Sequence, residues 1–172
     1  MNITLHKIII TGAVIGISTL WAGEYDSIYT SIKENHCRTI LTDELGSTQE
    51  CRSFANINVQ VIDSDLRQSI TLLRRGNLYP LNFFVKVSSR WSMLGDKIEW
   101  RYRKNDRAHP IAMIVRFKVS ENLNAPNKMT SYLVVSKITH DNICVVGKIP
   151  PQAKQNQLAR NMAERAQNMD CL

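Results

Sequence analysis

Residues 97–119 read KIEWRYRKNDRAHPIAMIVRFKV, and the two alternating halves of this stretch decide the fold class. In the first half, the apolar side chains of Ile98, Trp100 and Tyr102 alternate with charged ones. The second half carries an apolar row at alternate positions: Ile111, Met113, Val115, Phe117 and Val119. Successive side chains of a strand point to opposite faces, so each half predicts a strand with one buried face. Turn formers at 105–106 lie between the halves, and the pair therefore predicts an antiparallel hairpin.

Other segments have β-branched and apolar residues at strand spacing, namely 27–32, 58–62, 66–72, 131–138 and 143–146. The segment 66–72 also fits a short helix, although we favour a strand. Residues 78–94, which include Pro80, predict an irregular segment tucked against the core. Pro150 and Pro151 end strand pairing because proline has no N–H to donate. The expected architecture is a mainly antiparallel sheet of about six to eight strands.

The C-terminal tail changes from strand to helix periodicity. Residues 152–169 contain no Gly, Pro or β-branched residue, which predicts one amphipathic helix of about five turns. Its apolar stripe is Leu158, Met162, Ala166 and Met169. We interpret this stripe as a face packed on the sheet rather than as a groove for a partner. Strands followed by one terminal helix give an α+β fold.

The N-terminus has the three-part layout of a secretory signal peptide. Lys7 precedes an uncharged, mostly apolar run at 8–22, which is shorter than the roughly 20 residues of a membrane-spanning helix. We expect cleavage after Ala22, which leaves 23–172 as a single α+β domain without a stable membrane span. A buried core helix and a retained, uncleaved anchor are the alternatives. The predicted location is therefore periplasmic or extracellular.

All four cysteines, Cys37, Cys51, Cys144 and Cys171, lie downstream of the predicted leader. An even number in an exported chain indicates two disulfides, for which three pairings exist. We favour Cys37–Cys51 with Cys144–Cys171, because this pairing closes the shortest loops. A cysteine-based metal site lacks a C-x-x-C pair and a histidine at ligand spacing. A catalytic cysteine is disfavoured because a paired thiol is not a nucleophile.

The formal net charge of +7 is concentrated in one stretch. Residues 67–107 contain ten Lys or Arg against three Asp or Glu, a net charge of +7 for the segment. The densest part predicts a partner or anion surface made of Arg101, Arg103, Lys104 and Arg107. Such a surface suits an envelope or secreted protein, a lipid headgroup or an anionic envelope polymer. A solvated strand edge kept from pairing by its charges is the alternative. Export disfavours nucleic acid, and the sequence does not define an oligomeric state.

Catalytic and cofactor motifs are missing from the sequence. The leader aside, its histidines are His36, His109 and His140, each beside a predicted turn or loop. The sequence has no G-x-S-x-G, H-E-x-x-H, calcium-loop or phosphate-loop pattern, so we expect no cofactor, no metal and no catalytic residue. The favoured function is a non-catalytic binding module that acts through its basic surface. The alternative is an inhibitor of a secreted hydrolase such as a lysozyme or protease, and an enzyme ranks third.

Several short pieces together resemble a known family. They are Tyr29-Thr30-x-Ile32 before Cys37, then Cys51, Asp65-Leu66-Arg67, Ile98-Glu99-Trp100-Arg101, Leu133-Val134-Val135, Cys144, Asn156-x-Leu158-Ala159-Arg160, and Asp170-Cys171. With them the chain resembles an uncharacterised family of small exported alphaproteobacterial proteins with four cysteines. The chain departs from that family at 52–56, where relatives have a Gly-rich aromatic stretch. The resemblance implies export and the same cysteine pairing, and it implies no activity.

Overall fold

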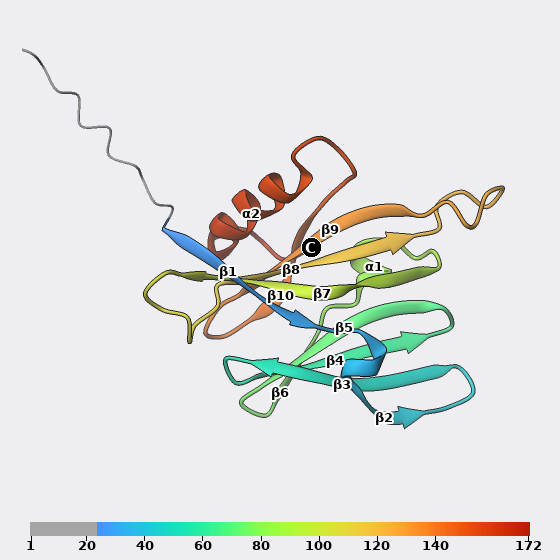
Figure 1. Cartoon of the computed structure of the whole chain (residues 1–172), viewed down its shortest axis with the longest axis horizontal. Helices are drawn as coiled ribbons and strands as arrows, with labels where there is room; N and C mark the ends of the chain where they lie inside the picture. Colours follow the sequence, from blue (N-terminus) through green and yellow to red (C-terminus); the bar gives the residue numbers. More distant parts are fainter. Residues whose placement is uncertain (1–23) are drawn as a thin grey trace, which may run out of the picture.

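A computed structural model describes residues 24–172 of the chain (Figure 1). The predicted leader and its cleavage point after Ala22 lie outside the described residues. No helix within residues 24–172 has both the length and the apolar character that a membrane crossing requires.

Within residues 24–172, ten strands form one sheet, which is more than the six to eight that the sequence predicts. They are β1 (Tyr25–Ser31), β2 (Arg38–Thr42), β3 (Gly46–Phe54), β4 (Ile57–Ser64), β5 (Arg67–Arg74), β6 (Asn77–Pro80), β7 (Ser92–Arg103), β8 (Ala112–Val119), β9 (Thr130–Ile138) and β10 (Ile143–Ile149). The unpredicted strands are β2, β3 and β6, none of which has a clear alternation of apolar and polar residues. The 78–94 segment holds β6 and a one-turn helix, α1 (Phe83–Lys86), whose Phe83 is buried in the core.

The sheet is antiparallel except at one point. Its strand order is β10-β9-β8-β7-β5-β4-β3-β2, with β1 paired to β7 and β6 paired to β5. The predicted hairpin is confirmed, because β7 pairs antiparallel with β8, with Trp100 opposite Met113. Only the bridge between Arg67 of β5 and Ser92 of β7 is parallel. This bridge joins the four-strand run β2–β5 to the run β7–β10.

The sheet curls around the main core. Side chains of β4 and β5 pack in one apolar cluster with side chains of β7, β8, β9 and β10. Consistent with this curvature, β6 and β10 approach each other although they are far apart in the strand order. Two aromatic pairs lie inside, Phe54 with Trp100 and Phe83 with Phe117, at centroid distances of 5.5 and 5.3 Å.

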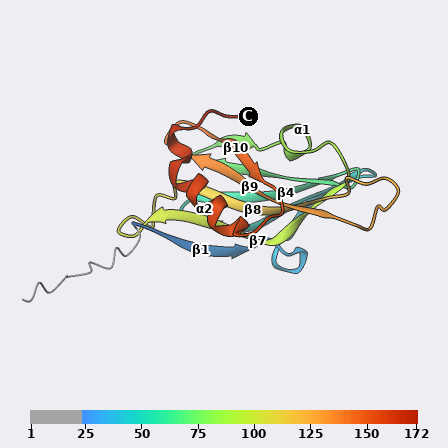
Figure 2. The same cartoon turned by 90° about the horizontal axis from the view of Figure 1, so that it is seen from above.

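A second, smaller core lies on the outer face of β8, β9 and β10, where α2 (Gln155–Arg165) packs (Figure 2). A 3₁₀ turn, η2 (Ala166–Asn168), continues it, so the regular helix is shorter than the predicted span 152–169. Three members of the predicted apolar stripe face this core: Ala166 is buried in it, and Met162 and Met169 pack against it. Leu158 does not, because it is 39% exposed, and the other fully buried side chains of the helix are Ala159 and Ala163. These alanines let the helix approach the sheet closely.

The expected cysteine pairing is confirmed at both bridges. Cys37 joins Cys51 with the Cα atoms 4.2 Å apart, and Cys144 joins Cys171 with a Cα separation of 5.7 Å. The first bridge fastens the segment before β2 to β3. The second ties the C-terminal tail after η2 to β10, and it thereby holds α2 over the outer face of the sheet.

Candidate functional site

Arg101 does not belong to an exposed surface, in contrast to the sequence prediction. Arg101 is only 7% exposed, and its guanidinium pairs with the carboxylate of Glu164 on α2. Nη1 of Arg101 also donates to Oγ of Ser27 on β1 at 2.7 Å. Strand alternation correctly assigns Arg101 to the face away from the main core. That face is covered by α2, which the sequence pattern does not reveal.

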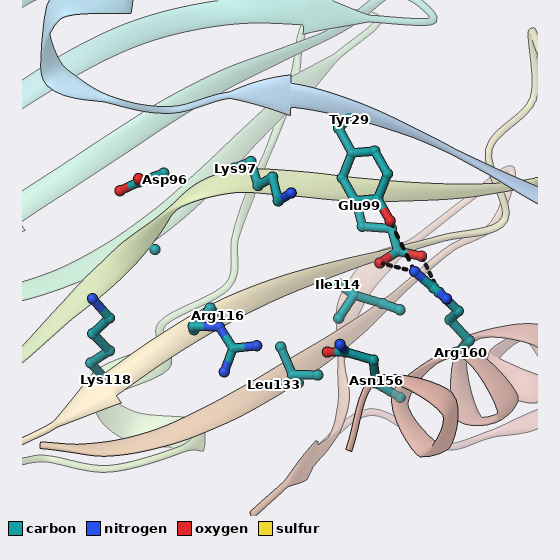
Figure 3. Close-up of a pocket in the computed structure, with 12 residues that line it drawn as sticks. Tyr29, Asp96, Lys97, Glu99, Ile114, Arg116, Lys118, Leu133, Asn156 and Arg160 are labelled. Carbon is teal, nitrogen blue, oxygen red and sulfur yellow. Dashed lines mark hydrogen bonds and ion pairs between the residues drawn. The ribbon is translucent and has the colours of Figure 1, made fainter. Parts of the chain in front are cut away.

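Glu99 lies under the same helix and is held as a carboxylate. Nε of Arg160 donates to Oε1 of Glu99 at 2.7 Å (Figure 3). Oγ of Ser27 donates to the same oxygen at 2.6 Å. Burial acts to raise the pKa of Glu99, but the hydrogen bonds from Arg160 and Ser27 outweigh it and lower this pKa from its ordinary value of 4.5. The charged outer face of β7 therefore serves to dock α2 through ion pairs.

The other predicted surface residues, Arg103, Lys104 and Arg107, are exposed. They lie at the end of β7 and in the loop that leads to β8. Nη1 of Arg103 donates to Oε1 of Glu24 at 2.9 Å, and its guanidinium lies 5.8 Å from the ring centroid of Tyr25. Both residues are exposed, so this contact contributes little to stability.

Four loops meet at the same end of the sheet and enclose a cleft of about 430 Å³. These loops join β3 to β4, β5 to β6, β7 to β8 and β9 to β10 (left in Figure 1). The first two are tight because their central residues have positive φ: Ala55 and Asn56 at 51° and 60°, and Arg75 and Gly76 at 53° and 79°. Such turns suit the twist of adjacent strands.

We call this cavity the end cleft and define it by five side chains that line it: Arg74, Arg75, Arg103, His109 and His140. Nη2 of Arg74 donates to the carbonyl oxygen of His140 at 2.7 Å, and Nη1 of Arg75 contacts Nε2 of His140 at 2.8 Å. An arginine N–H can only donate, so Nε2 of His140 accepts and the ring proton lies on Nδ1. These contacts fix both arginines to the β9–β10 turn at the wall of the cleft.

Positive charge exceeds negative charge at this end of the molecule. The cations are Arg74, Arg75, Arg103, Lys104 and Arg107, and the carboxylates are Glu24, Asp106 and Asp141. Glu24 pairs with Arg103, whereas Asp106 and Asp141 contact the imidazoles of His109 and His140 at 2.6 Å. Four cations therefore have no carboxylate within 4.0 Å among residues 24–172. These cations can bind an anion without first breaking an ion pair.

Sequence reasoning identified part of this site. Arg74 and Arg75 belong to the basic stretch 67–107, but the sequence pattern does not place them beside Arg103, and it predicts only a turn or loop beside His109 and His140. The order of the hairpin turns is the sequence signal that could have placed these residues together, because every second hairpin turn lies at the same end of an antiparallel sheet. In the part of the chain that the structure describes, no three His, Cys, Asp or Glu residues gather as a metal site would require.

Comparisons of the chain with protein-family models, with curated proteins and with solved structures give no match. The resemblance to the exported alphaproteobacterial family therefore stays a prediction.

Proposed function

We propose that this chain is an exported, non-catalytic binding protein that holds an anionic polymer of the cell envelope at the end cleft. The observation that supports it most is the set of four cations at one end of the sheet without a carboxylate partner: Arg74, Arg75, Lys104 and Arg107. Cations left unpaired at a protein surface attract a polyanion over several ångströms and can contact several of its charges at once.

The chemistry of the end cleft favours a polymer over a folded protein partner. Charged, imidazole and amide side chains line much of it, and its large apolar lining residues, Ile57, Ile111 and Ile138, are buried or half-buried, so none of them projects as an exposed anchor. Stable protein interfaces rely on buried aromatic or large aliphatic anchors at their centre. A polymer with repeated negative charges needs no such anchor and follows the spacing of the cations.

Export is supported by two observations of different kinds. Both pairs of cysteines form disulfides, which persist in oxidising compartments. The sequence of residues 1–22 has the layout of a secretory leader. An anionic envelope polymer lies on the route of an exported protein, whereas nucleic acid does not.

Binding to immobilised dextran sulfate, a polyanionic glycan, tests the proposal against uncharged dextran. The wild-type protein is expected to bind the sulfated polymer, and Lys104→Glu with Arg107→Glu is expected to abolish most of that binding. Lys104 and Arg107 lie in the β7–β8 loop, which forms one wall of the end cleft, and the matched control is Arg90→Glu with Lys128→Glu, which makes the same change of net charge at two exposed positions outside both the cleft and this loop. Equal loss in both variants, or no binding by the wild type, would overturn the proposal.

A second candidate function, inhibition of a secreted protease, rests on the hairpin β2–β3. All five residues of β2 are exposed, and Leu41 and Leu45 are 59% and 70% exposed. The Cys37–Cys51 bridge fastens the start of this hairpin. Exposed apolar side chains on a fastened hairpin suit a protein partner. A panel of secreted proteases should include one that the wild type inhibits and Leu41→Asp does not, and a panel without any inhibited enzyme contradicts this candidate.

A further inference from the structure

A second cavity lies on the outer face of the sheet beside α2, and the end cleft does not include it. It measures about 380 Å³ and is lined from β1, β7, β8, β9 and α2 (Figure 3). We call it the helix groove and define it by Tyr29, Lys97, Arg116, Lys118 and Asn156. Its volume is at the lower end of the range for small-molecule sites.

An irregularity in the sheet opens this groove. The register of β7 against β8 shifts between Leu94 and Ile98, so residues 95–97 of β7 are not opposite regular partners. Gly95 lies within this irregularity, and a Cβ atom at this position would come within 2.8 Å of Cβ of Arg116. Glycine therefore lets β7 approach the base of Arg116, whose guanidinium extends between Lys118 and Leu133 in Figure 3.

The cations of the helix groove lack acidic partners. No carboxylate of residues 24–172 lies within 4.0 Å of the charged nitrogens of Lys97, Arg116 or Lys118. The two acids that line the groove are engaged elsewhere: Asp96 pairs with Lys33 at 3.5 Å, and Glu99 pairs with Arg160. The groove thus presents three uncompensated positive charges.

Protein contacts fix the position of the groove's cations but leave donors free. Nη1 of Arg116 donates to Oγ of Ser131 at 2.7 Å, while its Nε and Nη2 donate to no side chain among the described residues. Nζ of Lys97 lies 4.6 Å from the ring centroid of Tyr29. A guanidinium with two free donors in one plane matches the paired oxygens of a phosphate group.

The ring of Tyr29 is an exposed apolar surface of the groove. Ile114, Leu133 and Ala159 also line the groove but are only 3%, 6% and 0% exposed, whereas Tyr29 is 45% exposed. A bare inorganic ion would leave the Tyr29 ring in contact with water. A ligand with a compact apolar body would cover it and gain roughly 25 cal/mol for each Å² of apolar surface removed from water.

We infer that the helix groove binds an organic phosphate monoester with a compact apolar body, its phosphate beside Arg116 and Lys118 and its body against the ring of Tyr29. The site is separate from the end cleft and takes a small molecule instead of a polymer. Asn156, at the start of α2, supplies an amide donor at its edge. The inference does not depend on the function proposed for the end cleft.

Titration calorimetry with phenyl phosphate tests this inference, with phenol and inorganic phosphate as matched ligands. Phenyl phosphate is expected to bind at least about tenfold more tightly than either, equivalent to about 1.4 kcal/mol. Phenol shares the body without the charge, and inorganic phosphate shares the charge without the body. Binding of phenyl phosphate no tighter than that of either comparison ligand would overturn the inference, as would the absence of binding at millimolar concentration.

Variants locate the binding site. Arg116→Gln is expected to weaken phenyl phosphate binding by at least about tenfold. Arg116 also donates a hydrogen bond to Oγ of Ser131, so its replacement can disturb the sheet, and Lys118→Gln is therefore the second variant. The ammonium of Lys118 makes no ion pair among residues 24–172, so its loss leaves the fold intact. Lys104→Glu with Arg107→Glu should retain phenyl phosphate binding, and Lys118→Gln should retain dextran sulfate binding. Unchanged affinity in a folded Lys118→Gln protein would refute the placement of the phosphate.

Discussion

Replacing Cys144 and Cys171 together by alanine removes the bridge between β10 and the C-terminal tail. The two residues are 27 positions apart, so the bridge closes a loop of 28 residues in the unfolded chain. The chain-entropy relation assigns such a loop about 3.6 kcal/mol of stabilisation at 25 °C. The same relation assigns about 3.0 kcal/mol to the 15-residue loop of Cys37–Cys51, which is 14 positions apart. The logarithm in the relation makes the two losses nearly equal.

Urea unfolding measures both losses, and hydrogen exchange separates their locations. The Cys144–Cys171 bridge holds the tail that follows α2, so we expect its removal to increase exchange in α2 more than in β4 and β5. Removal of Cys37–Cys51 should leave exchange in α2 unchanged. A loss of less than about 1 kcal/mol for the Cys144–Cys171 pair, with an unchanged urea m value, would refute the loop argument. Equal exchange of α2 in both variants would refute the role of the bridge in docking the helix.

Two further outcomes follow from contacts within the sheet and under α2. The pKa of Glu99 is lowered in the folded protein, so its carboxylate stabilises the fold above its unfolded value of 4.5, and this contribution is lost as pH falls through the lower folded value. In urea titrations, the free energy of unfolding of the wild type should therefore exceed that of Glu99→Gln by less and less as pH decreases below about 4.5. A difference that stays constant down to pH 3 contradicts this role of the Glu99 carboxylate. Gly46→Ala places a Cβ atom 1.9 Å from the backbone oxygen of Asp63, so we expect a loss of about 1–3 kcal/mol in thermal or urea unfolding. Gly147→Ala meets only the flexible end of a methionine and should cost much less, so equal losses at the two glycines would contradict the steric argument.

The strands that the sequence predicts are those with one face in the main core. In β7 and β8 one face carries an apolar row at alternate positions, and the structure buries Trp100 and Met113 as expected. In contrast, β2 is exposed at every position, and β6 has four residues and ends in Pro80. Edge strands of this kind are stabilised by backbone pairing to a neighbour. Because that pairing leaves no pattern of apolar side chains, periodicity cannot reveal them.

Whether Arg101 is exposed or buried depends on tertiary packing. Alternation places it on the face away from the main core, which is correct, but exposure depends on whether another element covers that face. The helix that covers it buries Ala159 and Ala163 and leaves Leu158 exposed, although Met162, Ala166 and Met169 of the predicted stripe do pack on the sheet. At the position of Leu158 the sequence pattern favours the larger apolar side chain, whereas close packing on the sheet selects the smaller alanines.

The end cleft joins residues from four loops, and only the loop between β7 and β8 was predicted as a site. Arg75 and His140 are 65 positions apart in sequence and in hydrogen-bond contact in the structure. The sequence predicted the turn at 140–142, but the β5–β6 hairpin at Arg75–Gly76 was not predicted because β6 lacks a strand pattern. Without that hairpin, nothing in the sequence places Arg74 and Arg75 at the same end as Arg103.

The salt dependence of dextran sulfate binding tests the central claim, that the unpaired cations of the end cleft and of the adjoining β7–β8 loop hold a polyanion. Each cation that contacts the polymer releases about one counterion, so the logarithm of the affinity falls linearly with the logarithm of salt concentration. Lys104→Glu with Arg107→Glu should reduce that slope by about two, while Arg90→Glu with Lys128→Glu should leave it unchanged. Identical slopes for the wild type and both variants would contradict the claim, because the polymer would then not contact this end of the sheet.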